Sequence, residues 1–171
     1  MEGINCIIGI DCGVSGGIAV WRQGEPVKTY KMPKNIELLD QFIRYNKDLY
    51  NPLVFVEKLQ IRHDDEGAKI FRIKSMMANY EQVKTILTIN HVPYVLVHPM
   101  KWQSTLHLRN GKEERTDRKR RYRDYAQSLY KEVDATLWNA DALLIMHFGR
   151  HMLAADPIWV ASNLPSNNTL L

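Results

Sequence analysis

The stretch IIGIDCGVSGGIAVW, residues 7–21, decides the fold prediction. Aliphatic residues lead up to one acid, Asp11, and the chain then turns through a glycine-rich GVSGG segment. This pattern predicts a buried strand over residues 4–11, a tight turn, and a returning strand over residues 17–21. A carboxylate without a partner is costly to bury. An acid at the end of a buried strand therefore suggests a bound ion or a dedicated partner.

The length of 171 residues suits one well-buried domain, because two domains would each be small. We predict one domain over residues 1–155 and a C-terminal extension over residues 156–171, which is poor in charge. No apolar run reaches the roughly 18 residues of a membrane span, and the first residues lack a signal-peptide pattern. Cys6 and Cys12 have no metal-ligand spacing, which indicates a reducing compartment. We expect a cytoplasmic protein.

The net charge of +4 is concentrated in one segment. Residues 109–123, RNGKEERTDRKRRYR, hold eight Lys or Arg against three Asp or Glu, a local charge of +5, which leaves about −1 for the rest of the chain (4 − 5). Such a segment is typical of a phosphate-binding surface, although a solvated helix face has the same composition. The basic residues expected to contact nucleic acid here are Lys112, Arg115, Arg118, Lys119, Arg120, Arg121 and Arg123.

Hydrophobic spacing predicts the remaining elements. A third strand over residues 27–32 completes an antiparallel meander. It is followed by a helix over 35–50, a strand over 52–59, a helix over 66–89, a strand over 93–99 and helices over 100–108, 121–130 and 139–152. The prediction is one α/β domain with a mixed five-stranded sheet flanked by helices, which is the element order of the ribonuclease H-like fold.

Three acids stand at positions that this order could bring together. Asp11 and Glu57 end predicted strands, and Asp141 lies in the first turns of the last helix. Each alone has an ordinary explanation: a turn acceptor, a strand-end surface acid and a helix-start residue favoured by the helix dipole. Together they would repel one another unless a cation were bound. Carboxylate oxygens are preferred ligands of Mg²⁺ and Mn²⁺, and two such ions can promote phosphodiester hydrolysis. We predict a metal site.

Four segments carry a family resemblance: IIGIDCGVSGGIAV, VFVEKLQ, VPYVLVHPMKWQSTL and NADALLIMHFG, in this order between residues 7 and 149. With them the chain resembles the RuvC-like Holliday junction resolvases, especially the short phage and bacterial branch. Pro99 and Trp102, followed by a basic helix, are a further family mark. The resemblance implies a homodimeric, Mg²⁺-dependent endonuclease, with Mn²⁺ able to substitute, that resolves four-way and related branched DNA.

The resemblance also implies roles for single residues. Asp11, Glu57 and Asp141 match the family's metal-binding acids. Lys119 matches a basic catalytic position near the scissile phosphate, and Lys101 and Trp102 fall in an element that leads toward the DNA.

One position departs from the family pattern. The residue three before the last aspartate is usually an acid or a histidine, and here it is Trp138, whose indole offers only an N–H donor. Asp134 or Asn139 could substitute as the further metal ligand, or three acids could suffice. The departure keeps open a non-catalytic, branched-DNA-binding member of the same fold. A nuclease that prefers flaps, forks or RNA–DNA hybrids is also open, because fold alone does not set the substrate.

Overall fold

The computed structural model describes residues 3–13, 15–59, 68–111 and 113–165. The elements are β1 (Cys6–Ile10), β2 (Gly17–Arg22), β3 (Lys28–Lys31), α1 (Ile36–Leu49), β4 (Pro52–Glu57), α2 (Ala68–Ile89), β5 (Tyr94–Val97), α3 (Pro99–Thr105), α4 (Arg115–Leu129), α5 (Ala140–Ala155) and α6 (Pro157–Ser162). The five strands form one sheet in the order β3-β2-β1-β4-β5. The predicted mixed five-stranded α/β fold is confirmed.

The sheet joins an antiparallel half to a parallel half. β1 pairs antiparallel with β2, and β2 with β3. On its other side β1 pairs parallel with β4, and β4 with β5. The C-terminal ends of β1, β4 and β5 therefore meet along one side of the sheet, which we call the carboxyl edge.

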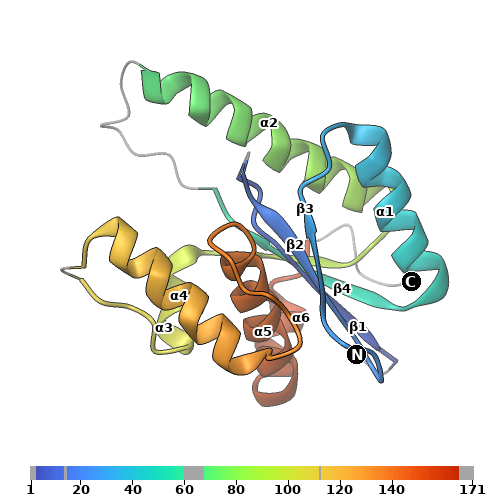
Figure 1. Ribbon diagram of the computed structural model, residues 1–171. Coiled ribbons are helices and arrows are strands. Elements are labelled where there is room, and N and C mark those ends of the chain that lie inside the picture. The colour runs from blue at the N-terminus through green and yellow to red at the C-terminus, as the bar shows by residue number, and fades with distance from the viewer. Residues whose placement is uncertain (1–2, 14, 60–67, 112, 166–171) are drawn as a thin grey trace.

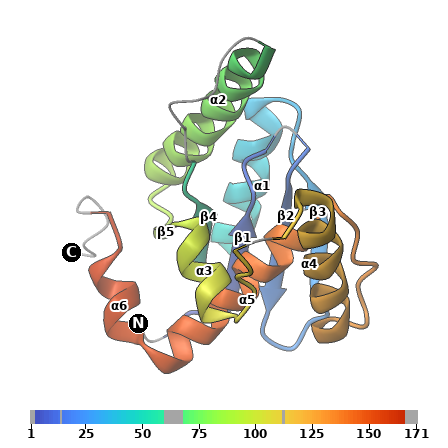
Figure 2. The same ribbon diagram turned by 90° about the vertical axis from the view of Figure 1, so that its left-hand side faces the viewer.

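Helices cover both faces of the sheet (Figures 1 and 2). Alternate residues of β1 and β4 enter two separate cores, because successive side chains of a strand point to opposite faces. Ile7 and Phe55 belong to the core beneath α3, α4 and α5. Ile8 and Val54 belong to the core beneath α1 and α2. Both strands are buried on each face, which explains their continuous apolar sequence.

A glycine sets the distance between α5 and the sheet. A Cβ atom at Gly9 would lie 2.3 Å from the backbone nitrogen of Met146 and 2.4 Å from the carbonyl oxygen of Ala142. Any side chain at this position would push the helix away. The bare backbone of Gly9 lets α5 lie directly on β1, and this contact brings the first turn of α5 to the carboxyl edge.

Three helix boundaries differ from the prediction, and one of them is the end of α5, at Ala155 and not at residue 152. The basic segment is itself helical, since α4 begins at Arg115 and not near residue 121. In contrast, α3 ends at Thr105, before the predicted end at residue 108. His107 has a φ of 56°, a left-handed conformation that does not continue a helix.

The predicted C-terminal extension contains a helix that the sequence analysis missed. Asp156 accepts a hydrogen bond from the backbone N–H of Trp159 at 3.0 Å, and Pro157 occupies the first turn, so α6 has an ordinary start signal. Val160 is fully buried, and the Trp159 ring meets Phe148 of α5 edge-on at 5.7 Å. The described part of the extension therefore packs on the domain.

Some predictions concern residues outside the described ranges. Lys112 and residues 166–171 belong to this group, as do the first two residues of the predicted helix over 66–89. Within the described ranges, no helix is long and apolar enough to cross a membrane.

Candidate active site at the carboxyl edge

Strand alternation directs two of the predicted acids to the same face. Asp11 is two positions beyond Gly9, and Glu57 is two positions beyond Phe55, so both belong to the face that α5 covers. The pairing of Ile10 with Val56 ends level with this point. Asp11 and Glu57 are thus the next residues on adjacent strands, whose axes are about 4.8 Å apart.

Asp141 reaches the same place from α5. It lies in the first turn of the helix, and only 7% of it is exposed. Its Oδ2 accepts a hydrogen bond from Nζ of Lys119 on α4. Its Oδ1 is buried and has no hydrogen-bond partner among the described residues. The structure brings Asp11, Glu57, Asp141 and Lys119 together, and we call the three carboxylates the acid cluster.

The three carboxylates influence one another electrostatically. Burial and then the nearby Asp141 carboxylate raise the pKa of Asp11 above its ordinary value. Burial, followed by the charges of Asp11 and Asp141, raises the pKa of Glu57 to about 8. The Lys119 ammonium acts in the opposite direction on both groups. Without further positive charge, a pKa of about 8 favours the protonated form of Glu57 at neutral pH.

The glycine turn after β1 fixes the conformation of Asp11. The backbone N–H of Gly13 donates to Oδ1 of Asp11 at 3.0 Å, and the N–H of Asp11 donates to the carbonyl oxygen of Gly17 at 3.0 Å. A Cβ atom at Gly16 would lie 2.1 Å from the carbonyl oxygen of Asp11. Only glycine fits that position, so the turn and the orientation of the acid depend on each other.

Sequence reasoning missed the partner of Glu57. The indole N–H of Trp102 on α3 donates to Oε1 of Glu57 at 2.9 Å. Trp102 is completely buried, and its ring meets the Tyr122 ring of α4 edge-on at 5.3 Å. The sequence analysis treated Trp102 as part of an element leading toward DNA, whereas it is a core residue that holds a carboxylate. No feature of the spacing between residues 57 and 102 indicates this contact.

Neither suggested substitute for the missing ligand joins the acid cluster. Asp134 is exposed and lines a surface hollow beside the start of β3, two strands away from β1. The Asn139 side chain accepts from the backbone N–H of Thr136 at 2.7 Å and donates to Oγ1 of Thr29 and to the carbonyl oxygen of Asp134 at 3.3 and 3.0 Å. Its amide is used to fix the loop before α5.

The donor chemistry of the acid cluster fits a hard divalent cation. All three side chains offer carboxylate oxygens, the ligands that Mg²⁺ and Mn²⁺ prefer, and Oδ1 of Asp141 is buried without a hydrogen bond from the described residues. Among those residues, however, no group of three or more His, Cys, Asp or Glu side chains is arranged so that it could hold a metal ion. Lys119 is the cation that the structure places against the cluster.

The predicted basic residues divide into two groups. Arg115, Arg118 and Lys119 lie on the side of α4 that also carries the buried Tyr122, since positions three and four apart share a helix face. The other side chains are engaged elsewhere: Arg121 with Glu113 at 2.8 Å and with the carbonyl oxygen of Leu108, Arg123 with Asp124, Arg120 with Asp117, and Lys101 over the Trp159 ring at 5.1 Å.

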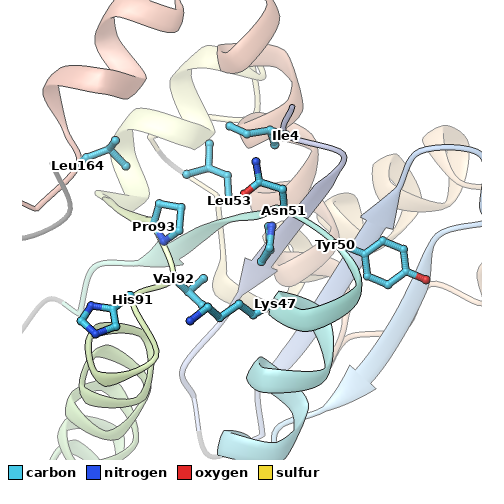
Figure 3. A pocket seen from close by; sticks show the side chains of 10 residues that line it. Ile4, Lys47, Tyr50, Asn51, Leu53, His91, Val92, Pro93 and Leu164 are labelled. Atoms are coloured by element: carbon cyan, nitrogen blue, oxygen red, sulfur yellow. The ribbon is translucent and has the colours of Figure 1, made fainter. Parts of the chain in front are cut away.

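A separate hollow of about 310 Å³ lies at the opposite edge of the sheet (Figure 3). Its walls come from the segments that precede or begin β1, β4 and β5, including Ile4, Leu53 and Pro93, and Leu164 closes one side. None of its lining residues is acidic. It is therefore distinct from the acid cluster.

The sheet order and flanking helices define the class of the protein: a ribonuclease H-like α/β domain with carboxylates at the carboxyl edge. Solved structures share this fold, two RuvC structures among them. One is T. thermophilus RuvC in complex with a Holliday junction substrate, with a TM-score of 0.55 and 15% identity over 88% of this chain and 96% of that one. The other is Thermus thermophilus RuvC, with a TM-score of 0.52 and 15% identity over 93% and 98%. No protein-family model matches the sequence, and neither does any curated protein.

Proposed function

We propose that the protein is a metal-dependent endonuclease that resolves four-way and related branched DNA junctions by hydrolysing a phosphodiester. The observation that carries this proposal is the acid cluster itself: three carboxylates from β1, β4 and α5 at one edge, with Lys119 against one of them. The RuvC-like fold supports it, since one structural neighbour is a complex with a Holliday junction. A junction has two-fold symmetry, so we also propose a homodimer with two active sites.

In this proposal the acid cluster holds Mg²⁺, or Mn²⁺ in its place. Such an ion, when bound, would activate a water molecule at neutral pH and offset negative charge on the leaving oxygen. Asp11 is oriented by the Gly13 N–H and Glu57 by the Trp102 indole, so the chain itself sets where the carboxylate oxygens lie. Lys119 is within reach of Asp141 and is the basic group placed to contact a phosphate beside it.

The basic side of α4 extends this arrangement away from the acids. Arg118 and Arg115 follow Lys119 toward the start of the helix, on one side. A DNA backbone whose scissile phosphate is at the acid cluster could continue along this row. Contacts of this kind recognise phosphate without reading sequence, and salt weakens them.

The test is cleavage of a labelled four-way junction beside matched duplex and flap DNA, in Mg²⁺, in Mn²⁺ and in chelator. We expect paired symmetric nicks in the junction that disappear with chelator and with D11N. The D11N protein should still bind the junction, equally or more tightly, because the substitution removes a negative charge beside the phosphates. Cutting of flaps or duplex in place of junctions would support phosphodiester hydrolysis but contradict the junction as the substrate.

A second candidate is a non-catalytic protein that binds branched DNA. It is favoured by Trp138, which stands where a further ligand is expected. It is also favoured by the finding that no three His, Cys, Asp or Glu side chains of the described residues are arranged to hold a metal ion. Tight junction binding with no cleavage in either metal would establish this candidate.

A further inference from the structure

One row of cross-strand neighbours, which we call a level of the sheet, contains two residues of the acid cluster. Gly17 is paired with Lys31 on one side, and Glu57 is paired with Val97 on the other. Asp11 lies between Gly17 and Glu57, as the next residue after the pairs Ile10–Ile18 and Ile10–Val56. The level therefore reads Lys31, Gly17, Asp11, Glu57, Val97. Neighbouring positions are about 4.8 Å apart.

Trp138 covers the glycine in this level. Ring atoms Cε3 and Cζ3 would be 3.0 Å from a Cβ atom at Gly17, so the indole rests on the bare backbone. The Lys31 ammonium is 6.0 Å from the centre of the same ring. The ring is thus one strand away from Asp11, and a cation accompanies it.

The residue that follows Trp138 is held by hydrogen bonds, but the Trp138 ring is not fully buried. The next residue, Asn139, is 1% exposed and is held by hydrogen bonds to Thr136, Thr29 and Asp134. Trp138 itself is partly exposed, and the preceding Leu137 is 54% exposed. Core packing does not explain why a partly exposed aromatic ring lies beside the acid cluster.

We infer that Trp138 and Lys31 form a binding subsite for an unpaired nucleobase and its phosphate, next to the acid cluster. The indole stacks on the base, and the Lys31 ammonium contacts the phosphate. Stacking on an aromatic ring is open to any base, because every base has a π-face. The subsite would therefore favour DNA with unstacked bases at a branch point, without reading their identity. The inference rests on the proposed function, whose substrate it specifies.

The test compares three changes at position 138: W138L, W138F and W138A. Leucine keeps apolar bulk over Gly17 without a π-face, whereas phenylalanine keeps the π-face. Binding is measured in chelator, so that cleavage does not interfere, with a four-way junction carrying 2-aminopurine at the branch point and with a matched duplex. We expect W138L and W138A to weaken junction binding about tenfold and to abolish quenching of the 2-aminopurine, with W138F within about threefold of wild type and duplex binding unchanged.

The matched control is W21A. Trp21 stands on the same strand and face as Gly17 and carries a cation, Arg150, at 4.5 Å from its ring, but it is paired with Ile7 at the far end of the sheet. W21A should leave quenching and junction affinity unchanged. Unaltered quenching in W138L, or equal losses in W138L and W21A, would overturn the inference.

A single-stranded oligonucleotide containing 2-aminopurine separates this inference from the proposed function. One outcome is that the wild-type protein does not prefer the junction over duplex while Trp138 still quenches 2-aminopurine in the single strand. In that case the proposed junction resolution is rejected and the base subsite stands. If the junction is bound and cut while W138L behaves as wild type, the subsite fails and the proposed function stands. A wild-type protein that binds none of these DNAs overturns both.

Discussion

Two tryptophans flank the acid cluster, and their surroundings differ. Trp102 lies on the Glu57 side, is fully buried, and donates its N–H to that carboxylate at 2.9 Å. Trp138 lies on the Asp11 side and is partly exposed. Its indole N–H has no hydrogen-bond partner among the described residues, and its ring rests on Gly17 with Lys31 nearby. One ring can act only on the protein's own carboxylate. The other has a surface that a ligand could meet.

The difference follows from what surrounds each ring. α3 and α4 enclose Trp102, whose polar N–H must find an acceptor in the core, and Glu57 provides it. Trp138 lies in the loop before α5 and is partly exposed. Two residues of the same type beside the acid cluster are thus expected to have different roles, one orienting a carboxylate and the other contacting substrate.

The largest expected effect is the pH dependence of stability in the metal-free protein. Glu57 has a pKa of about 8 when folded against an ordinary 4.5, so between these values the folded state binds a proton that the unfolded state lacks. The free energy of unfolding should therefore decrease as pH rises from about 4.5 to about 8, by roughly a few kcal/mol. Denaturant unfolding in chelator measures this, and E57Q should flatten the curve.

Substitutions of the two tryptophans should have different effects on this pH dependence. The Trp102 hydrogen bond lowers the pKa of Glu57, so W102F should extend the decrease to higher pH, whereas W138L should leave its range unchanged. Stability that rises with pH in wild type would contradict the buried, mutually repelling acids.

W102F should be the next largest effect. It leaves Oε1 of Glu57 without its buried donor and opens space beside Tyr122, and the two losses together should cost about 3 kcal/mol of unfolding free energy. Loss of a hydrogen bond to a metal-binding carboxylate typically weakens metal binding or activity 10- to 100-fold, so Mn²⁺ affinity by direct titration should fall by about that factor. W138L should cost less than about 1 kcal/mol and leave Mn²⁺ affinity intact. Equal Mn²⁺ affinity in W102F and wild type would reject the orienting role.

Neutralising Lys119 together with Arg120 should moderately weaken binding to all forms of DNA, which neither tryptophan substitution is expected to do. K119Q/R120Q should weaken binding to junction, duplex and flap alike, by about tenfold at low salt, and reduce the salt dependence by about two charges. The control is K131Q, an exposed charge just beyond the other end of α4. A loss confined to one junction sequence would contradict the backbone-binding role.

The smallest expected effect is that of G17A. The added methyl group would be 3.0 Å from the Trp138 ring, which must move by a few tenths of an ångström. We expect about 1 kcal/mol of destabilisation and about a threefold loss of junction affinity. G111A, at a glycine with open space around its Cβ position, is the control and should change neither quantity. If G17A quenches 2-aminopurine in the junction as the wild type does, the exact position of the Trp138 ring does not matter for stacking on the base.

The sequence by itself determined the element order and the acids of the cluster. Aliphatic runs ending at Asp11 and Glu57 are local signals, since strand burial and strand ends are encoded within a few residues. A parallel pair of neighbouring strands then places both acids at one edge. Asp141 followed from its place in the first turn of an apolar helix. The helical start at Asp156 and Pro157 was equally local, and was available though overlooked.

Only the tertiary structure decided what surrounds these acids. The Trp102–Glu57 hydrogen bond joins residues 45 positions apart, and the Lys119–Asp141 pair joins residues 22 apart, so no periodicity could reveal either. The exposure of Asp134 and the use of the Asn139 amide within its own loop depend on how that loop meets β3. Gly9 had no assigned role until α5 was placed against it, and Gly17, predicted as a turn residue, was not expected to contact the Trp138 ring. Local chemistry specifies which residues carry charge at strand ends, whereas partners, burial and access result from packing between segments that are distant in the chain.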